Sequence, residues 1–304
     1  MKVNNHIKTS PSRKVFVVTN TVLLVLLSCV FLFPYLNVLA KSLNDASDTA
    51  LGGLTVFPRA FTLTNFKVVF ADETLMSSFF VTVAYVVIGS AWALFVNYSA
   101  AYALLQKTLW AKKIFLAILT IPMFISGGLI SNLLIYAKLK VYNTFFVYIL
   151  PQAFSFFNMV VIRTYLSGIS DSYREAARID GASEITVMLK IYLPLSMPIV
   201  STILLWTAVS YWNDWTTSLY YIRNSSLYTM QYVLQQSLKE TNRIQTLIAN
   251  AIANGLPIGN VDSSVSGDSI QSAQIIVTTL PILLVYPFLQ KYFIKGVMIG
   301  GIKE

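Results

Sequence analysis

Long apolar runs, each able to cross a lipid bilayer, constrain this chain more than any other feature. The first run extends from Val15 to Leu36 and contains no charged residue. A helix needs about 20 apolar residues to cross the hydrocarbon core. Further runs lie at residues 77–105, 114–136, 145–166, 195–219 and 272–289. Because helices satisfy their own backbone hydrogen bonds in lipid, the pattern predicts an all-α integral membrane protein with six transmembrane helices spread over residues 15–290.

Composition excludes the common soluble classes. Only 12% of the residues are charged, whereas soluble domains average about 25%. A single cysteine, Cys29, rules out an internal disulfide framework and a cysteine-cluster metal site. A single histidine, His6, rules out a zinc-binding histidine pair and a Ser-His-Asp triad. The sequence therefore predicts neither a metal site nor a catalytic site.

The first apolar run is interpreted as a retained helix. Val38-Leu39-Ala40 resembles the cleavage site of a signal peptide. However, the run is longer than the roughly 7–15 apolar residues of a typical signal sequence. We therefore expect it to remain in the mature protein as the first transmembrane helix.

Basic residues predict the orientation in the membrane. With six spans, 14 of the 22 Lys and Arg residues fall on one side together with 5 of the 13 acidic residues, so the whole net charge of +9 lies there. Basic residues accumulate on the cytoplasmic side. This predicts a cytoplasmic N-terminus (1–14), a cytoplasmic loop (168–194) and a cytoplasmic tail (291–304). The charge thus reports topology, and no nucleic-acid partner is expected.

The longest outer segment is predicted at residues 221–271. Its stretch from Asn254 to Ser269 is rich in Gly, Ser and Asp, which is typical of a flexible loop.

The polar loop at 168–194 carries the most specific pattern. Ser172 followed by Glu175 forms a capping box that predicts a short helix. Gly181 suits the left-handed residue that ends such a helix. A second short helix is expected from about Ser183 to Tyr192, and Pro194 is expected to begin the next span. Together these elements predict a pair of short helices along the membrane surface.

Small and charged residues of this loop predict a docking surface for a cytoplasmic protein. The small residues would admit a partner's backbone, and the flanking charges, which include Glu184, would orient it. The residues of this predicted docking surface are Arg174, Glu175, Ala176, Ala177, Arg178, Asp180, Gly181, Ala182, Leu193 and Pro194. The alternative is an ordinary capped connector between two spans.

The pattern Glu175-Ala-Ala-x3-Gly181, followed by Ile191-x-Leu193-Pro194, resembles the EAA loop of ABC-importer permeases. Other segments are similar to carbohydrate importers, most of all to oligosaccharide permeases of the LplC and YtcP type. The segments that carry this second likeness are 55–66, 158–163, 212–215, 227–231 and 290–296.

This resemblance implies the type I importer (MetI-like) permease fold in a bacterial cell membrane. It also implies a transport subunit that is not itself an enzyme, with ATP and Mg²⁺ bound by a partner ATPase and no cofactor in this chain. The implied partners are a second homologous permease, two ATPase subunits, an extracellular sugar-binding protein, an oligosaccharide and lipid. Within the family, the EAA loop transmits ATPase closure to the transmembrane helices.

Candidate substrate-path residues lie in spans four and five. Tyr211, Trp212, Asn213, Asp214 and Trp215 stand toward the outer end of span five. They form an outer gate, a contact with the sugar-binding protein, or an aromatic belt with a solvated carboxylate. Asn158 in span four either lines the path or bonds a neighbouring helix.

Three rival functions are weighed against this one. An ion-coupled secondary transporter needs ionisable residues inside the membrane, and the spans are nearly free of them. A membrane-embedded enzyme needs paired acids or a metal motif, which the sequence lacks. An ABC permease for a non-sugar solute stays open, because the loop alone does not specify the substrate.

Overall fold

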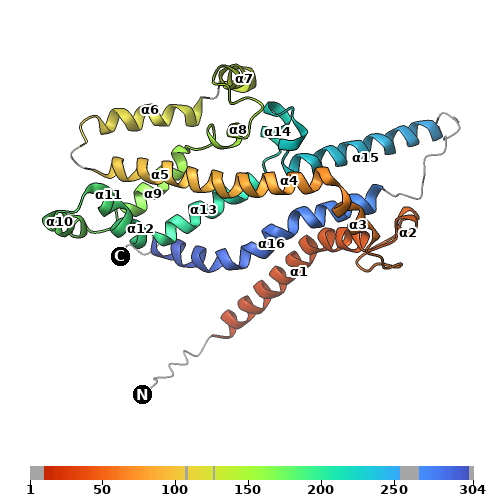
Figure 1. Cartoon of the computed structure of the whole chain (residues 1–304). Helices are drawn as coiled ribbons and strands as arrows, with labels where there is room; N and C mark the ends of the chain where they lie inside the picture. Colours follow the sequence, from red (N-terminus) through yellow and green to blue (C-terminus); the bar gives the residue numbers. More distant parts are fainter. Residues whose placement is uncertain (1–9, 107–108, 126, 254–266, 301–304) are drawn as a thin grey trace. The chain divides into compact units, whose positions relative to one another are not determined.

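The computed structural model is helical almost throughout (Figure 1). It describes residues 10–106, 109–125, 127–253 and 267–300. Its longer helices are α1 (Pro11–Ser42), α3 (Thr64–Ala71), α4 (Glu73–Ala84), α5 (Ser90–Leu105), α6 (Lys112–Phe124), α7 (Gly128–Lys138), α9 (Phe156–Leu166), α10 (Ser172–Ile179), α13 (Met197–Trp212), α15 (Met230–Ala253) and α16 (Gly267–Gly300). Shorter elements are α2 (Ala46–Ala50), η1 (Tyr85–Gly89), α8 (Phe146–Ile149), α11 (Glu184–Val187), η2 (Met188–Tyr192), α12 (Leu193–Leu195), α14 (Thr216–Tyr221) and η3 (Ser225–Leu227).

The chain divides into two compact units. One comprises Met1–Val69 and Thr241–Val277, and the other comprises Phe70–Glu240 and Thr278–Glu304.

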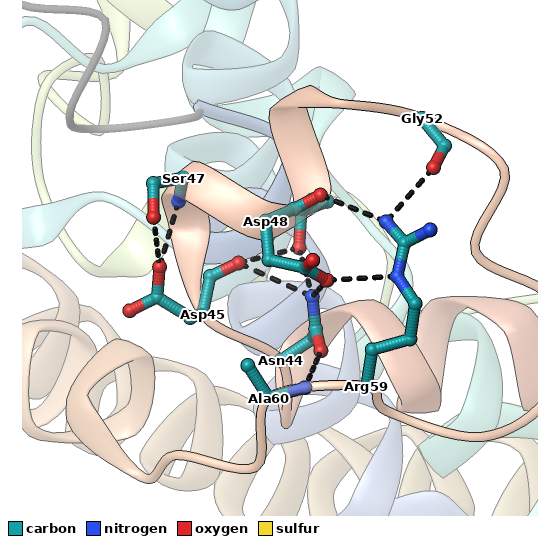
Figure 2. Close-up of polar contacts among 8 residues, drawn as sticks. Asn44, Asp45, Ser47, Asp48, Gly52, Arg59 and Ala60 are labelled. Atoms are coloured by element: carbon teal, nitrogen blue, oxygen red, sulfur yellow. Dashed lines mark hydrogen bonds and ion pairs between the residues drawn. The ribbon is translucent and has the colours of Figure 1, made fainter.

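In the first unit, a polar network organises the segment after α1 (Figure 2). The Asn44 amide donates to Asp48 at 2.8 Å and to Thr49 at 3.0 Å, while its oxygen accepts from the Ala60 N–H at 2.7 Å. Arg59 forms an ion pair with Asp48 at 3.0 Å. The network satisfies the buried polar groups of a segment that has little apolar core of its own.

In the second unit, α4, η1 and α5 form one 33-residue helical run, Glu73–Leu105. The π turn of η1 lies where α13 passes closely. A Cβ on Gly89 would lie only 3.0 Å from the Tyr211 ring, so the missing side chain permits this approach. At this end of the unit a buried cluster forms around Tyr85, Tyr148 and Tyr211.

A second buried cluster lies at the other end of α5. It contains Tyr102, Met159, Ile162, Leu166 and Tyr192, contributed by α5, α9 and the 168–194 loop. Figure 1 shows α10 and α11 beside this end of α5. The loop is therefore packed onto the helices rather than detached from them.

The helices do not follow the six predicted runs as continuous rods. Among the described residues, α1, the Glu73–Leu105 run and Gly267–Val285 of α16 are each long and apolar enough to cross a membrane. Two bent pairs bring the total to five if each pair is one span. One pair is α6 with α7. The other joins the 184–195 helices to α13 through an 85° bend. Run 145–166 is divided into α8 and the 11-residue α9.

Prolines lie at two of these breaks. Pro151 lies between α8 and α9, and Pro198 is the second residue of α13, just after the bend at Ser196. Proline removes a backbone donor and cannot continue a helix across its preceding turn. Apolar runs found from hydropathy alone do not reveal such interruptions.

The predicted outer segment 221–271 is mostly helical. The 24-residue helix α15 occupies residues 230–253, and α16 already begins at Gly267. Residues 254–266 of the predicted flexible stretch lie outside the described residues, as do 1–9 of the N-terminus and 301–304 of the tail.

Candidate functional site

The 168–194 loop forms the expected helix–glycine–helix unit. Gly181 has a φ of +77°. Its N–H donates to the Arg178 carbonyl at 3.1 Å, and the Ala182 N–H donates to the Ala177 carbonyl at 2.9 Å. These two bonds make up a Schellman motif, which ends α10 and directs the chain into α11.

The start of α10 differs from the predicted capping box. The helix begins at Ser172 with Asp171 as its N-cap, and no side chain caps it. The Ser172 N–H instead donates to the Ser170 hydroxyl at 3.3 Å. The second helix follows the expectation, because Ser183 accepts from the Thr186 N–H at 3.3 Å and helical turns continue to Leu195. Pro194 lies before the 85° bend, so the next long helix begins only at Met197.

The residues expected to share a docking surface are distributed over two faces. Glu175, Ala176, Asp180, Gly181 and Pro194 are exposed. Arg174 and Ala177 are buried against the rest of the unit. Arg178 is exposed, whereas Ala182 and Leu193 are half-buried.

Large apolar side chains that the sequence reading omitted stand on the same surface. Ile179 is 86% exposed and Ile185 is 68% exposed. Tyr173 is also exposed. Exposed apolar groups next to charges are typical of a protein-binding surface. They had no place in the predicted surface, because that surface is defined by small and charged residues.

A cluster of five polar side chains connects this loop to α5. We call it the Glu184 cluster; its members are Tyr102, Gln106, Arg174, Arg178 and Glu184. One carboxylate oxygen of Glu184 accepts from the Tyr102 hydroxyl at 2.8 Å and from the Gln106 amide at 3.0 Å. The other accepts from Arg178 Nε at 2.7 Å. Arg174 donates to the Gln106 amide oxygen at 2.7 Å, so both loop helices are bonded to the end of α5.

Glu184 is held in its charged form by these donors. Partial burial alone would raise its pKa, but the hydrogen bonds from Tyr102, Arg178 and Gln106 together lower the pKa below its ordinary value. The sequence reading placed Glu184 only among the orienting charges. Tyr102 and Gln106 were missed, since nothing in an apolar run marks which residue meets a distant loop.

At the opposite end of the unit, Asp214 is an organising group. Its carboxylate accepts from the Tyr85 hydroxyl at 3.2 Å, from the Gln152 amide at 3.1 Å and from the Thr216 N–H at 3.0 Å. It also accepts from the Thr217 N–H at 3.1 Å. Asp214 therefore caps the turn into α14 and joins three elements, so it is not simply a solvated carboxylate.

The aromatic residues near Asp214 face different surroundings. Tyr211 is buried, stacks on Tyr85 with ring centroids 4.7 Å apart, and donates to the Gln152 carbonyl at 2.8 Å. Trp212 is also buried, and its indole N–H donates to the Thr278 carbonyl at 3.1 Å. It borders an apolar hollow of about 290 Å³.

The remaining two residues of this group are less enclosed. Asn213 is exposed, and its amide donates to the Val209 carbonyl at 2.8 Å. Trp215 is half-buried, and the Lys239 ammonium lies 5.5 Å from its ring centroid. The five neighbours in sequence therefore do not form one site.

A polar hollow of about 340 Å³ lies among α5, α9 and α13. We call it the polar pocket; its lining is Ala93, Asn97, Gln152, Ser155, Asn158, Trp206, Thr207, Ser210 and Tyr211. Two predicted path residues, Asn158 and Tyr211, meet here. Asn158 stands near the start of α9 rather than in mid-span.

Some lining groups are already engaged, whereas others are available. Asn97 donates to the Ala93 and Ala153 carbonyls at 2.7 and 2.9 Å and accepts from the Ser155 N–H at 2.9 Å. Within the described part of the chain, the Asn158 side-chain amide has no hydrogen-bond partner. Trp206 is 40% exposed and stacks on Phe157 with centroids 6.0 Å apart. An aromatic face beside a free amide suits a hydroxyl-rich ring. Trp206 was missed because an isolated tryptophan in a span is usually lipid-facing.

Residues 100–299 match the family described as "Binding-protein-dependent transport system inner membrane component". The protein LplC of Bacillus subtilis is 35% identical over 291 residues, which is 95% of each chain. The permease protein YtcP of the polygalacturonan/rhamnogalacturonan transport system of the same organism is 29% identical and covers 92% of this chain and 95% of its own.

A solved structure has the same fold. It belongs to a bacterial ABC transporter involved in the import of the acidic polysaccharide alginate. The TM-score is 0.83 and the identity 26%, over 94% of this chain and 99% of that one.

Proposed function

The chain belongs to the family of binding-protein-dependent transport system inner membrane components, and we propose that it is a permease subunit of an ATP-driven oligosaccharide importer. The sugar substrates named for the similar YtcP permease and for the alginate transporter support an oligosaccharide. The proposed substrate is an oligosaccharide released by the breakdown of a polysaccharide.

The helix α5 contacts both the 168–194 loop and the polar pocket. Tyr102 and Gln106, at the end of α5, bond the 168–194 loop, and Ala93 and Asn97 of the same helix line the polar pocket. Nine residues separate Ala93 from Tyr102, and nine separate Asn97 from Gln106; this spacing is roughly 14 Å along a helix. A displacement of the loop would therefore move one wall of the pocket.

This arrangement supports alternating access. The loop binds a separate ATPase, which holds ATP and Mg²⁺ and performs the hydrolysis. Closure of that ATPase moves α10 and α11, and the Glu184 cluster transmits the movement to α5. The coupling residues are those predicted from the sequence, with Tyr102 and Gln106 added.

The assembly contains a second permease, two ATPase subunits and an extracellular sugar-binding protein. The chain is a multi-pass protein of the plasma membrane, and both termini lie in the cytoplasm on this proposal. Charge supports that orientation, because Arg174, Arg178 and Lys190 lie on the loop side.

In the polar pocket, Trp206 stacks on a sugar ring and Asn158 bonds its hydroxyl groups. Tyr211 supports the wall through its bond to the Gln152 carbonyl. Asp214 contributes to the pocket indirectly, because its carboxylate accepts a hydrogen bond from the lining residue Gln152. Trp212 has a packing role.

The test is reconstitution of the chain with its co-purified partners in proteoliposomes, with sugar-stimulated ATP hydrolysis and uptake measured together. Asn158→Ala should raise the sugar concentration for half-maximal uptake by about fivefold, because a lost neutral hydrogen bond is worth about 1 kcal/mol. The matched control is Asn213→Ala, an exposed amide outside the pocket. Equal effects of both variants would contradict the pocket assignment, and a chain that purifies without any partner would contradict the importer.

A further inference from the structure

Two basic side chains line a hollow next to the start of the 168–194 loop. Lys112 is the first residue of α6, and Arg163 lies near the end of α9. Both line a hollow of about 480 Å³ together with the chain from Ser167 to Asp171. This hollow is distinct from the polar pocket and shares no residue with it.

The positive charge of the hollow is not neutralised by acids of the described chain. Neither Lys112 nor Arg163 has an ion-pair partner within the described ranges. Arg163 Nε donates to the Leu104 carbonyl at 3.3 Å, which fixes its position but supplies no charge. Asp171, the acid in the lining, accepts from Arg174 at 3.2 Å. Two cations held in one hollow therefore leave a site for an anion.

The surroundings indicate where that anion comes from. The helix α6, which starts at Lys112, exposes Ile114, Phe115 and Ile118 and has no fully buried residue. A molecule in the hollow would thus have a charged end beside Lys112 and Arg163 and an apolar path along α6. Basic pockets next to transmembrane helices on the cytoplasmic side are suited to lipid headgroups.

We propose that Lys112 and Arg163 bind the phosphate of an anionic phospholipid, whose acyl chains lie along α6. A guanidinium donates in a planar fork that matches phosphate oxygens, and an ammonium adds a point charge. The lipid belongs to the inner leaflet, an assignment that rests on the proposed orientation.

The site has a direct connection to coupling. Ser167–Asp171, which lines the hollow, leads straight into α10. A bound phosphate would hold this segment in place. Lipid composition would then tune how firmly the coupling loop is positioned.

The test uses the full complex in nanodiscs of phosphatidylglycerol or phosphatidylcholine, with bound lipid read by native mass spectrometry. The variants are Lys112→Gln and Lys112→Gln/Arg163→Gln. The matched control is Lys113→Gln, a neighbouring cation that does not line the hollow. The double variant should retain phosphatidylglycerol roughly tenfold less than the wild type, and Lys113→Gln should match the wild type.

Three outcomes would overturn the proposal. They are unchanged retention in the double variant, an equal loss in Lys113→Gln, and displacement of the lipid by millimolar inorganic phosphate, which would identify a free-phosphate site. Lys112→Gln alone leaves the Arg163–Leu104 bond intact, so it reports on the site even if the double variant folds poorly. Lipid retention does not depend on sugar uptake, so a failure of the importer proposal would be recognised separately.

Discussion

The two ends of α5 are built differently around one carboxylate each. At the loop end, Glu184 is half-exposed, and its donors include the guanidinium of Arg178 and groups of α5. At the other end, the donors to Asp214 within the described residues are neutral, among them Tyr85 and Gln152. The first arrangement joins a short surface unit to a long helix, whereas the second joins parts of the helical core. The difference indicates that the loop end is a connection able to shift and that the Asp214 end is a fixed support.

The largest effect is expected from Trp212→Ala at the fixed end. The variant loses a buried indole and its bond to the Thr278 carbonyl, and truncations of this kind cost about 3–5 kcal/mol. The thermal stability of the detergent-solubilised chain should fall strongly. Trp206→Ala is the matched variant, because Trp206 lines the polar pocket instead of packing in the interior. The protein with this substitution should keep its thermal stability but bind sugar more weakly. Equal stability losses would remove the distinction between packing and lining tryptophans.

Gly181→Val tests the loop end. A left-handed φ costs a residue with a side chain about 1–2 kcal/mol, and nothing lies within 4 Å of the added Cβ, so the strain acts through the backbone. We expect sugar-stimulated ATP hydrolysis to drop about tenfold while membrane insertion persists. Gly52→Val has the same strain, with φ +76°, far away in sequence, and should leave coupling unchanged. Normal stimulation in Gly181→Val would contradict the coupling role.

Glu184→Ala removes the acceptor shared by the cluster. Hydrogen bonds to charged groups contribute about 1.5–3 kcal/mol, but the half-exposed position reduces this, so a several-fold loss of coupling is expected. Uptake per ATP hydrolysed is the measurement. Glu184→Gln, which keeps an acceptor, should lie between the wild type and Glu184→Ala. Glu175→Gln, on the exposed face, is the comparison for ATPase binding. If Glu175→Gln abolishes ATPase binding but Glu184→Ala leaves uptake unchanged, the Glu184 cluster does not transmit the movement.

The smallest effect concerns pH. Because the pKa of Glu184 is lowered in the folded chain, its contribution to stability is present above the ordinary value of 4.5 and is lost as the pH falls through the lower, folded value. The stability difference between the wild type and Glu184→Gln should therefore be constant from pH 8 to 6 and shrink below about pH 4.5. A difference that grows on acidification would have the wrong sign.

The loop and the spans differ in how far they could be predicted. The helix–Gly181–helix unit was predictable because a Schellman motif and an N-cap such as Ser183 are set by neighbours within a few residues. The capping box at Ser172 was wrong, since Ser170 and Asp171 upstream shift the helix start. The long apolar runs were visible, but the division of 145–166 and the bend at Ser196 depend on packing.

The amino-acid sequence by itself determined the helical membrane class and the local form of the loop, because hydropathy and capping are short-range properties. Only the tertiary structure decided that Arg174 is buried on Gln106, that Trp212 packs while Trp206 lines a pocket, and that one helix connects loop and pocket. Which way a side chain on an apolar helix points has no local signal when the helix is apolar all round. That choice is made by the neighbouring helices, which contribute the partners.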